Sequence, residues 1–172
     1  SDRLAGDVAL GHVGRFHDYQ LDVATLRHAA ETLECRAPLP VLAHSMGGCI
    51  ALRALCDGLQ TPAAAFSAPM WGLPLSRIMR MGIRSMARLA RPLGRDTAYL
   101  PTTGPQYGLP SMAFEDNPLT RDRAQFARMQ GQIRDNPMLA LGGPSLRWGA
   151  AALTEMAALA RLPAPDLPAL IG

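Results

Sequence analysis

The stretch Leu39-Pro-Val-Leu-Ala-His-Ser-Met-Gly-Gly-Cys-Ile50 decides the fold of this chain. Its first half is a short apolar run typical of a buried strand, and its second half continues as a helical apolar pattern. Ser45 stands where the two halves meet. A strand that reverses into a helix within a few residues holds the residue at the bend in a strained, exposed conformation, so its neighbours must be small. We expect Ala43 and Gly47 to provide that room, as in a nucleophile elbow.

The position of Ser45 predicts part of an oxyanion site. At a helix N-terminus, the amide of Met46 points to where an oxyanion would form, and the helix dipole adds favourable potential there. The motif departs from the usual G-x-S-x-G because Ala43 replaces the first glycine. One alternative therefore stays open from these residues alone, in which Ser45 is an N-cap after a buried strand, since serine is a favoured cap.

Composition bounds the class of protein. With 172 residues, 48% apolar and 18% charged, the chain is long enough for one globular domain. All 17 basic residues are arginine, and the net charge of +3 is too small and dispersed to indicate a nucleic-acid partner. No segment approaches the length of a membrane span. We expect no metal and no organic cofactor.

The ends and the cysteines give two further expectations. The chain opens on Ser1 without a signal-peptide pattern, so its beginning looks cut. The chain has an odd number of cysteines, namely Cys35, Cys49 and Cys56. The last two lie seven residues apart on one predicted helix, which is too far to form a disulfide bridge. Buried, reduced thiols in a cytoplasmic protein are the expected state.

The apolar periodicity predicts an α/β fold. After a glycine-containing loop over residues 1 to 16, the predicted elements are a helix over 17 to 34, a strand over 41 to 43, a helix over 47 to 59 and a strand over 62 to 68. Helix and strand alternate within a short length of chain, which indicates crossover units and a parallel sheet.

Beyond Pro69 the pattern becomes helical. Residues 74 to 92 predict an amphipathic helix whose arginines recur every three or four positions, at Arg77, Arg80, Arg84, Arg88 and Arg91. This stripe is either a solvated face or a surface for anionic phospholipid headgroups. Residues 95 to 117 are poorly periodic, and helices are predicted over 120 to 135 and 145 to 160, before a strand over 167 to 171.

Several stretches together resemble the α/β-hydrolase superfamily, and within it the bacterial lysophospholipase and monoacylglycerol lipase branch, related to serine aminopeptidase-type domains. The resemblance is carried by Phe16-His-Asp-Tyr19, the elbow from Ala43 to Gly48, Phe66-Ser-Ala-Pro-Met70, Asn117-Pro-Leu-Thr120 and Asn136 to Ser145. It implies a sheet covered by helices, an inserted helical cap, and a nucleophile, acid and histidine in that chain order.

The resemblance also implies a division of the chain and an incomplete site. Residues 1 to 72 would be a partial hydrolase core, 73 to 146 the cap or lid, and 147 to 172 the return to the core. The triad acid normally follows the strand expected at Leu167 to Ile171, and the histidine lies later still, so the chain looks like the middle of an enzyme. We expect the chain alone to be inactive, with the strand over 41 to 43 left as an uncovered sheet edge.

The ionisable residues within the chain are poor candidates for the other triad members. The histidines are His12, His17, His28 and His44, all before the elbow or adjoining the nucleophile. We expect packing or rim contacts for His44, a possible rim position for His12, and solvated or capping roles for the other two. Asp166 precedes its strand and is rejected as the acid, because ligands in open α/β sheets lie at the carboxyl ends of strands. Asp18 and Asp22 favour the first turns of their helix through its dipole.

The sequence thus predicts a serine hydrolase of carboxylic esters acting on monoacyl lipids such as lysophospholipids or monoacylglycerols. Ser45 is the predicted nucleophile and the Met46 N–H an oxyanion donor. The predicted pliable lining for an acyl chain is Met70, Trp71, Met79 and Met86, although methionines at helical spacing also fit a core. An aminopeptidase acting on small amides, and a non-catalytic segment that binds a lipid surface, are the alternatives.

Overall fold

The computed structural model describes residues 7, 9–101, 103–106 and 108–172. It divides into two compact units, which are described separately: one contains residues 14–81 and 150–172, and the other residues 1–13 and 82–149. The three-part division expected from the sequence stays a prediction.

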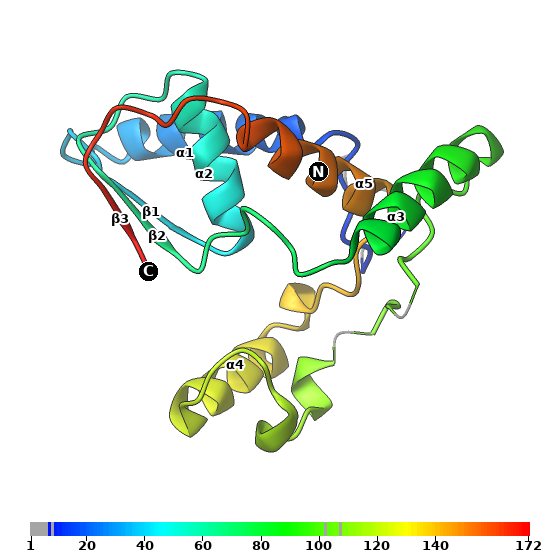
Figure 1. The fold of residues 1–172 in the computed structure, drawn as a ribbon. Coiled ribbons are helices and arrows are strands. Elements are labelled where there is room, and N and C mark those ends of the chain that lie inside the picture. The colour runs from blue at the N-terminus through cyan, green and yellow to red at the C-terminus, as the bar shows by residue number, and fades with distance from the viewer. Residues whose placement is uncertain (1–6, 8, 102, 107) are drawn as a thin grey trace. The chain divides into compact units, whose positions relative to one another are not determined.

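A parallel three-stranded sheet organises the first unit (Figure 1). Its strands are β1 (Val41–His44), β2 (Ala64–Ser67) and β3 (Ala169–Ile171), in the order β1-β2-β3. Val41 pairs with Ala64, which pairs in turn with Ala169. The parallel sheet confirms the predicted α/β class, and the order leaves β1 at an edge, as expected.

Two helices of this unit precede and follow β1. A 3-10 turn over Phe16–Asp18 leads into α1 (Tyr19–Thr32), and α2 (Met46–Cys56) follows the strand directly. The helix was expected to run to Leu59, but it ends at Cys56, and Gly58 adopts a φ of 98° in the turn that follows. That left-handed conformation is one that glycine tolerates without steric cost.

The core of the unit lies on one face of the sheet. Its buried members are Ala43, Ala51, Leu55, Ala64 and Phe66. On the other face of β1, Leu42 is 81% exposed, and Leu170 in the same register on β3 is 71% exposed. Because side chains alternate between the faces of a strand, the helical layer covers one face, and the opposite apolar face is open within the described residues.

The second unit is mainly helical. It contains most of α3 (Arg77–Ala90), the 3-10 turns Arg91–Leu93, Leu109–Ser111 and Phe114–Asp116, α4 (Arg123–Asp135), the turn Pro137–Leu139 and the start of α5 (Leu146–Leu159). Helix α4 begins later than the sequence suggested because Asp122 caps it, with its carboxylate accepting from the amides of Ala124 and Gln125. Leu109, Phe126 and Ile133 form a small core.

Backbone contacts connect distant segments within the second unit. Gly11 pairs with Pro144 in a parallel bridge, and Tyr99 pairs with Ser145 in an antiparallel one. The turn before α5 passes so close to its neighbours that a Cβ on Gly142 would lie 2.7 Å from the carbonyl oxygen of Pro105. Glycine is therefore required there by space. Among the described residues, none of the helices combines the length and hydropathy that crossing a membrane requires.

Candidate active site

The bend between β1 and α2 places Ser45 in a strained and exposed conformation. Its backbone has φ 50° and ψ −120°, a region that residues other than glycine rarely adopt, and the residue is exposed. Holding a side chain there costs on the order of 1–3 kcal/mol, so the surrounding structure must enforce it. The sharp strand-to-helix turn predicted from the sequence is therefore present.

Three backbone hydrogen bonds hold this bend. The amide of Ser45 donates to the carbonyl of Ser67 at 3.1 Å. The carbonyl of Ser45 accepts from the amides of Gly48 at 2.9 Å and Met70 at 2.8 Å. Two of these contacts come from β2 and the segment after it, so the conformation of Ser45 depends on the neighbouring strand as well as on its own helix.

The glycine that provides room at the elbow is Gly48, and the expectation that Gly47 does so was wrong. A Cβ on Gly47 would meet nothing within 4 Å among the described residues. A Cβ on Gly48 would lie 2.6 Å from the Cβ and 2.9 Å from the Cα of Pro69. Ala43 is 8% exposed and lies in the core, which agrees with the expectation that a small side chain is needed at this position.

The first turn of α2 presents amide groups at the bend. Ser45 is the N-cap and Met46 the first helical residue. A helix leaves its first amides without partners in its own ladder, and its dipole makes that end electropositive. The amide of Met46 is thus available by geometry to an anion next to Ser45, in keeping with the oxyanion role predicted for it.

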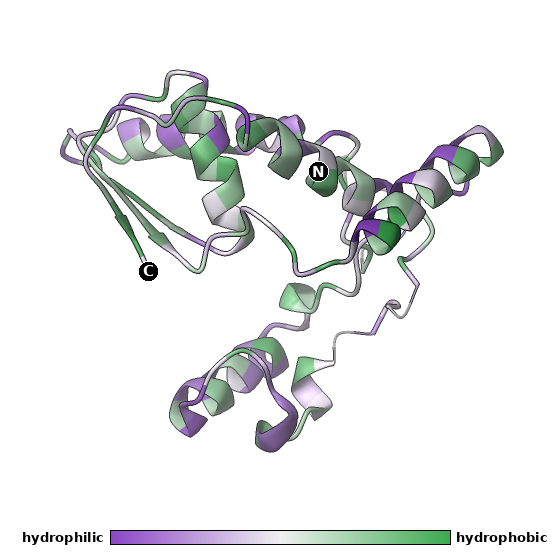
Figure 2. Ribbon diagram, viewed as in Figure 1, coloured by the Kyte–Doolittle hydropathy of each residue, from purple (hydrophilic) through white to green (hydrophobic). Residues whose placement is uncertain are grey.

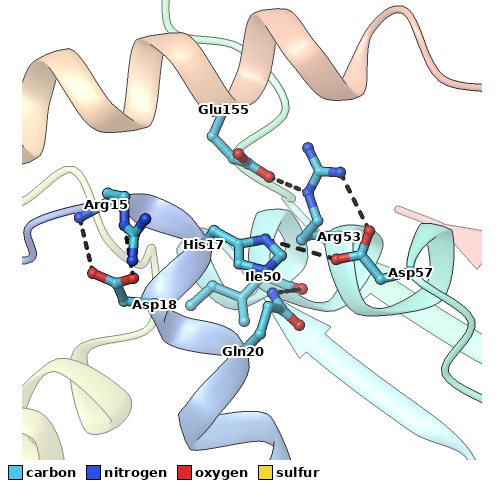
Figure 3. Close-up of polar contacts among 8 residues, drawn as sticks. All are labelled: Arg15, His17, Asp18, Gln20, Ile50, Arg53, Asp57 and Glu155. Carbon is cyan, nitrogen blue, oxygen red and sulfur yellow. Dashed lines mark hydrogen bonds and ion pairs between the residues drawn. The ribbon is translucent and has the colours of Figure 1, made fainter.

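Buried charges fix the far end of α2 (Figure 3). The Nε of Arg53 donates to the Glu155 carboxylate on α5, and its Nη1 lies 3.4 Å from Oδ1 of Asp57. The side chains of Arg53 and Glu155 are 14% and 11% exposed. The hydrogen bond that Arg53 donates to Glu155 raises the pKa of Arg53. Removing either partner of this pair would leave the other charge nearly buried and unpaired. The pair therefore ties α2 firmly to α5.

The cysteines are free thiols. Cys49 on α2 is completely buried, and burial raises its pKa to about 12, so it is inert as a nucleophile. Cys56 is half-buried. Cys35 is exposed and does not fit the expectation that all three thiols are buried, because it follows the end of α1 in a loop that the core does not reach.

The four histidines make contacts away from Ser45. Nδ1 of His44 lies 3.4 Å from Oγ of Ser67, at the carboxyl ends of β1 and β2. His17 lies 3.7 Å from the Asp57 carboxylate (Figure 3), and His28 is exposed on α1. None of the hydrogen bonds of the described residues joins a histidine to the hydroxyl of Ser45. These positions therefore do not assemble a Ser–His pair at the elbow.

His12 belongs to the other unit. Its Nδ1 lies 2.7 Å from Oγ of Ser145, which is completely buried and accepts from the amide of Trp148 at the start of α5. Burial, and then the positive charge of Arg147, lower the pKa of His12, while Asp96 opposes the shift. His12 thus connects an N-terminal loop to a helix start, a contact that the sequence did not suggest.

The acidic residues also lie away from a catalytic position. Asp166 is exposed before β3, as expected. Asp18 precedes α1 and accepts from the amide of Arg15, without a side-chain hydrogen bond to the helix it caps, so its contribution there is electrostatic. Asp22 lies in the first turn of α1. No group of His, Cys, Asp and Glu in the described residues could hold a metal ion.

The residues expected to line an acyl chain occupy two places. Met70 and Trp71 follow β2, and the indole Nε1 of Trp71 donates to the carbonyl of Gly48 at 3.2 Å. Met79 and Met86 lie on α3, where they are 54% and 42% exposed. The role of Trp71 and Pro69 in contacting the elbow was missed, since nothing in the spacing of single residues reveals it. The Arg53–Glu155 pair, 102 residues apart, was missed for the same reason.

Comparisons with known proteins agree with this geometry. The family model for serine aminopeptidase, S33, matches residues 6–171. Lysophospholipase L2 of Escherichia coli K12 is 35% identical over 156 residues, which cover 86% of this chain and 43% of that protein. The probable lysophospholipase L2 of Haemophilus influenzae is 29% identical over 163 residues, 94% of this chain and 50% of that protein. The chain spans about half the length of these relatives.

Solved structures share the fold. A monoacylglycerol lipase from Paleococcus ferrophilus superposes with a TM-score of 0.55 at 20% identity, covering 94% of this chain and 54% of the other. A soluble variant of monoglyceride lipase from Saccharomyces cerevisiae, in complex with a substrate analog, also gives 0.55 at 22% identity, covering 91% and 49%. The resemblance seen in the sequence is confirmed, and the chain belongs to the serine aminopeptidase S33 family of α/β-hydrolases.

Proposed function

We propose that the full-length protein is a serine hydrolase of carboxylic esters with Ser45 as its nucleophile. The observation that carries this proposal is the φ of 50° at an exposed serine directly before a helix N-terminus. Strain of this kind is retained where it has a use, and here it holds an exposed serine at the N-terminus of α2, where the first amides of a helix lack partners in its own ladder. A serine that served only as an N-cap would accept from an amide of α2, but the structure shows no such side-chain hydrogen bond.

The chemistry follows from this arrangement. A base removes the proton of the Ser45 hydroxyl as its oxygen attacks the ester carbonyl, and the oxyanion that forms accepts from the Met46 amide. The protonated base then gives its proton to the leaving alcohol, and water hydrolyses the acyl-enzyme. We place the base, a histidine, and its aspartate in the part of the full-length protein outside these 172 residues. The chain alone would then have no useful turnover.

Monoacyl lipids are the proposed substrates. Two relatives are named lysophospholipases, and two proteins of the same fold are named monoacylglycerol or monoglyceride lipases. We propose that Met70, Trp71, Met79 and Met86 line the path of the acyl chain. Thioether side chains are flexible and apolar, which suits a substrate with many conformations.

Labelling with a fluorophosphonate tests the proposal directly. The full-length protein should be labelled at Ser45, and the label should disappear in Ser45→Ala together with hydrolysis of lysophospholipid and monoacylglycerol. An unlabelled wild-type protein would support the non-catalytic alternative. Faster hydrolysis of aminoacyl amides than of monoacyl esters would support the aminopeptidase alternative.

We further propose that α3 rests on an anionic lipid surface, which would place a cytoplasmic enzyme at the periphery of the membrane. Figure 2 shows polar and apolar residues side by side along this helix. Its arginine face contains Arg77, Arg80, Arg84, Arg88 and the following Arg91; its apolar face contains Ile78, Met79, Met86, Leu89 and the following Leu93. At 3.6 residues per turn these faces lie on opposite sides of the helix.

Exposure and charge favour a lipid surface over a solvated helix. On the apolar face, Ile78 is 82%, Leu89 71% and Leu93 72% exposed, so large side chains face solvent without a partner among the described residues. Residues 72 to 95 contain no aspartate or glutamate. Apolar side chains that enter the acyl boundary, with arginines at the phosphates, are the arrangement of an interfacial helix.

A further inference from the structure

The segment that leaves β2 contacts the elbow at several points. Ser67 accepts from the Ser45 amide, Met70 donates to the Ser45 carbonyl, and Pro69 lies against Gly48. Ala68, between them, has a φ of 42°, so the chain is strained here as it is at Ser45. Two strained residues therefore follow neighbouring strands. Ser45 is held by hydrogen bonds with Ser67 and Met70, whereas the amide of Ala68 donates to the carbonyl of Gly172 after β3.

Trp71 completes this set of contacts through its side chain. Its Nε1 donates to the carbonyl of Gly48 at 3.2 Å. The indole is fixed by an edge-to-face contact with the buried Phe66, with ring centroids 5.0 Å apart and planes at 63°. Because the ring cannot turn freely between these contacts, the direction of its N–H is set by the core of the sheet.

The carbonyl that Trp71 binds belongs to the first turn of α2. Gly48 is the third residue of the helix, and its own amide donates to the Ser45 carbonyl. The same turn carries the Met46 amide. A hydrogen bond to Gly48 therefore acts on the peptide units that set both the position of the nucleophile and the direction of the oxyanion donor.

We propose that Trp71 is a positioning residue, which holds the first turn of α2 through Gly48 so that Ser45 and the Met46 amide keep their reactive geometry. This inference rests on the proposed function of Ser45. It assigns to the indole a task besides the acyl-chain contact proposed above, and kinetics separate the two. A residue that positions the nucleophile lowers kcat when it is changed, whereas one that only binds the acyl chain raises KM.

The test uses Trp71→Phe in the full-length protein, because phenylalanine keeps an aromatic ring beside Phe66 and removes the N–H. We expect kcat for a monoacyl ester, and the rate of Ser45 labelling by a fluorophosphonate, to fall about tenfold with KM nearly unchanged, since small displacements of reacting groups are costly. A second variant replaces Trp71 by 3-benzothienylalanine, which retains the shape of indole without its donor, and should show the same loss.

Gln20→Leu is the matched control. The Nε2 of Gln20 donates to the carbonyl of Ile50 at 3.1 Å, so this variant also removes one side-chain hydrogen bond to a carbonyl of α2 (Figure 3). The bond lies beyond the elbow turn. We expect Gln20→Leu to lower the unfolding midpoint about as much as Trp71→Phe does, while its labelling rate stays within twofold of wild type.

The outcomes are distinct. Labelled wild-type protein with an unchanged labelling rate in both Trp71 variants overturns the inference and leaves the proposed function intact. Equal losses in Gln20→Leu and Trp71→Phe also overturn it, because they would reflect a general loosening of α2. A rise in KM alone assigns Trp71 to the acyl chain only. Wild-type protein without labelling at Ser45 contradicts the proposed function, and the inference fails with it.

Discussion

Helix α3 buries a single residue, Ala87, whereas α2 buries five: Gly48, Cys49, Ala51, Ala54 and Leu55. The shorter helix is held by a sheet, by an aromatic side chain at one end and by buried charges at the other. The longer one keeps an apolar face exposed opposite its arginines. The difference indicates that α2 is built to stay in one position, while the character of α3 suits contact with something outside the chain.

Breaking the buried ion pair should have the largest effect on this comparison. Glu155→Ala removes the carboxylate that pairs with Arg53 and leaves a guanidinium 14% exposed. We expect the free energy of unfolding of the full-length protein to fall by about 3 kcal/mol, as for other pairs broken on one side. Urea denaturation measures this. Arg123→Ala, which breaks a pair with Glu115 whose side chains are 71% and 66% exposed, should change it by less than about 1 kcal/mol.

The two glycines of the elbow offer a sharper comparison. Gly48→Ala places a Cβ 2.6 Å from Pro69 and should destabilise the protein by about 2 kcal/mol, with reduced labelling of Ser45. Gly47→Ala, where the described residues leave open space, should be neutral or slightly stabilising because alanine favours a helix. Thermal unfolding and fluorophosphonate labelling of both variants check this. Equal damage from the two changes would contradict the assignment of Gly48 as the tight position.

Changes on α3 should affect binding and spare stability. Leu89→Asp puts a charge on the apolar face, at a side chain that is 71% exposed, and should weaken binding to phosphatidylglycerol vesicles about tenfold. Its unfolding midpoint should stay near that of wild type, since surface changes are usually within about 0.5 kcal/mol. Vesicle sedimentation measures the binding, and phosphatidylcholine vesicles serve as the neutral comparison. Undiminished binding to anionic vesicles by Leu89→Asp would contradict the proposed surface.

The smallest expected effect concerns pH. The pKa of His12 lies below its ordinary value of 6.5 in the fold, mainly because of burial, so the unfolded chain binds a proton more readily than the native protein. Stability from the neutral imidazole is therefore present above pH 6.5 and is lost as the pH falls from there toward the lowered pKa. Unfolding midpoints measured between about pH 7.5 and 5 at constant ionic strength should decline less in His12→Gln than in wild type.

The elements could be predicted because their signals are local. Alternating and helical apolar patterns located both helices that flank β1, and the elbow followed from a serine between small residues. The boundaries were less certain where side chains decide them: α4 begins at Arg123 because the Asp122 carboxylate satisfies its first amides. Chain order alone argued against the histidines as a base, and among the described residues none of them is hydrogen-bonded to Ser45. The glycine that carries the tight contact was misassigned, because Gly47 and Gly48 differ only in which neighbour they face.

The sequence by itself determined that Ser45 stands at a strand-to-helix bend, that the sheet is parallel, and that α3 is amphipathic, since each depends on residues near one another in the chain. Only the tertiary structure decided what holds the bend. The hydrogen bond from Trp71 to Gly48 joins residues 23 positions apart, and the pair of Arg53 with Glu155 joins residues 102 positions apart. Contacts at such separations depend on the directions in which side chains leave their elements, and the order of residues does not specify those until the sheet has formed.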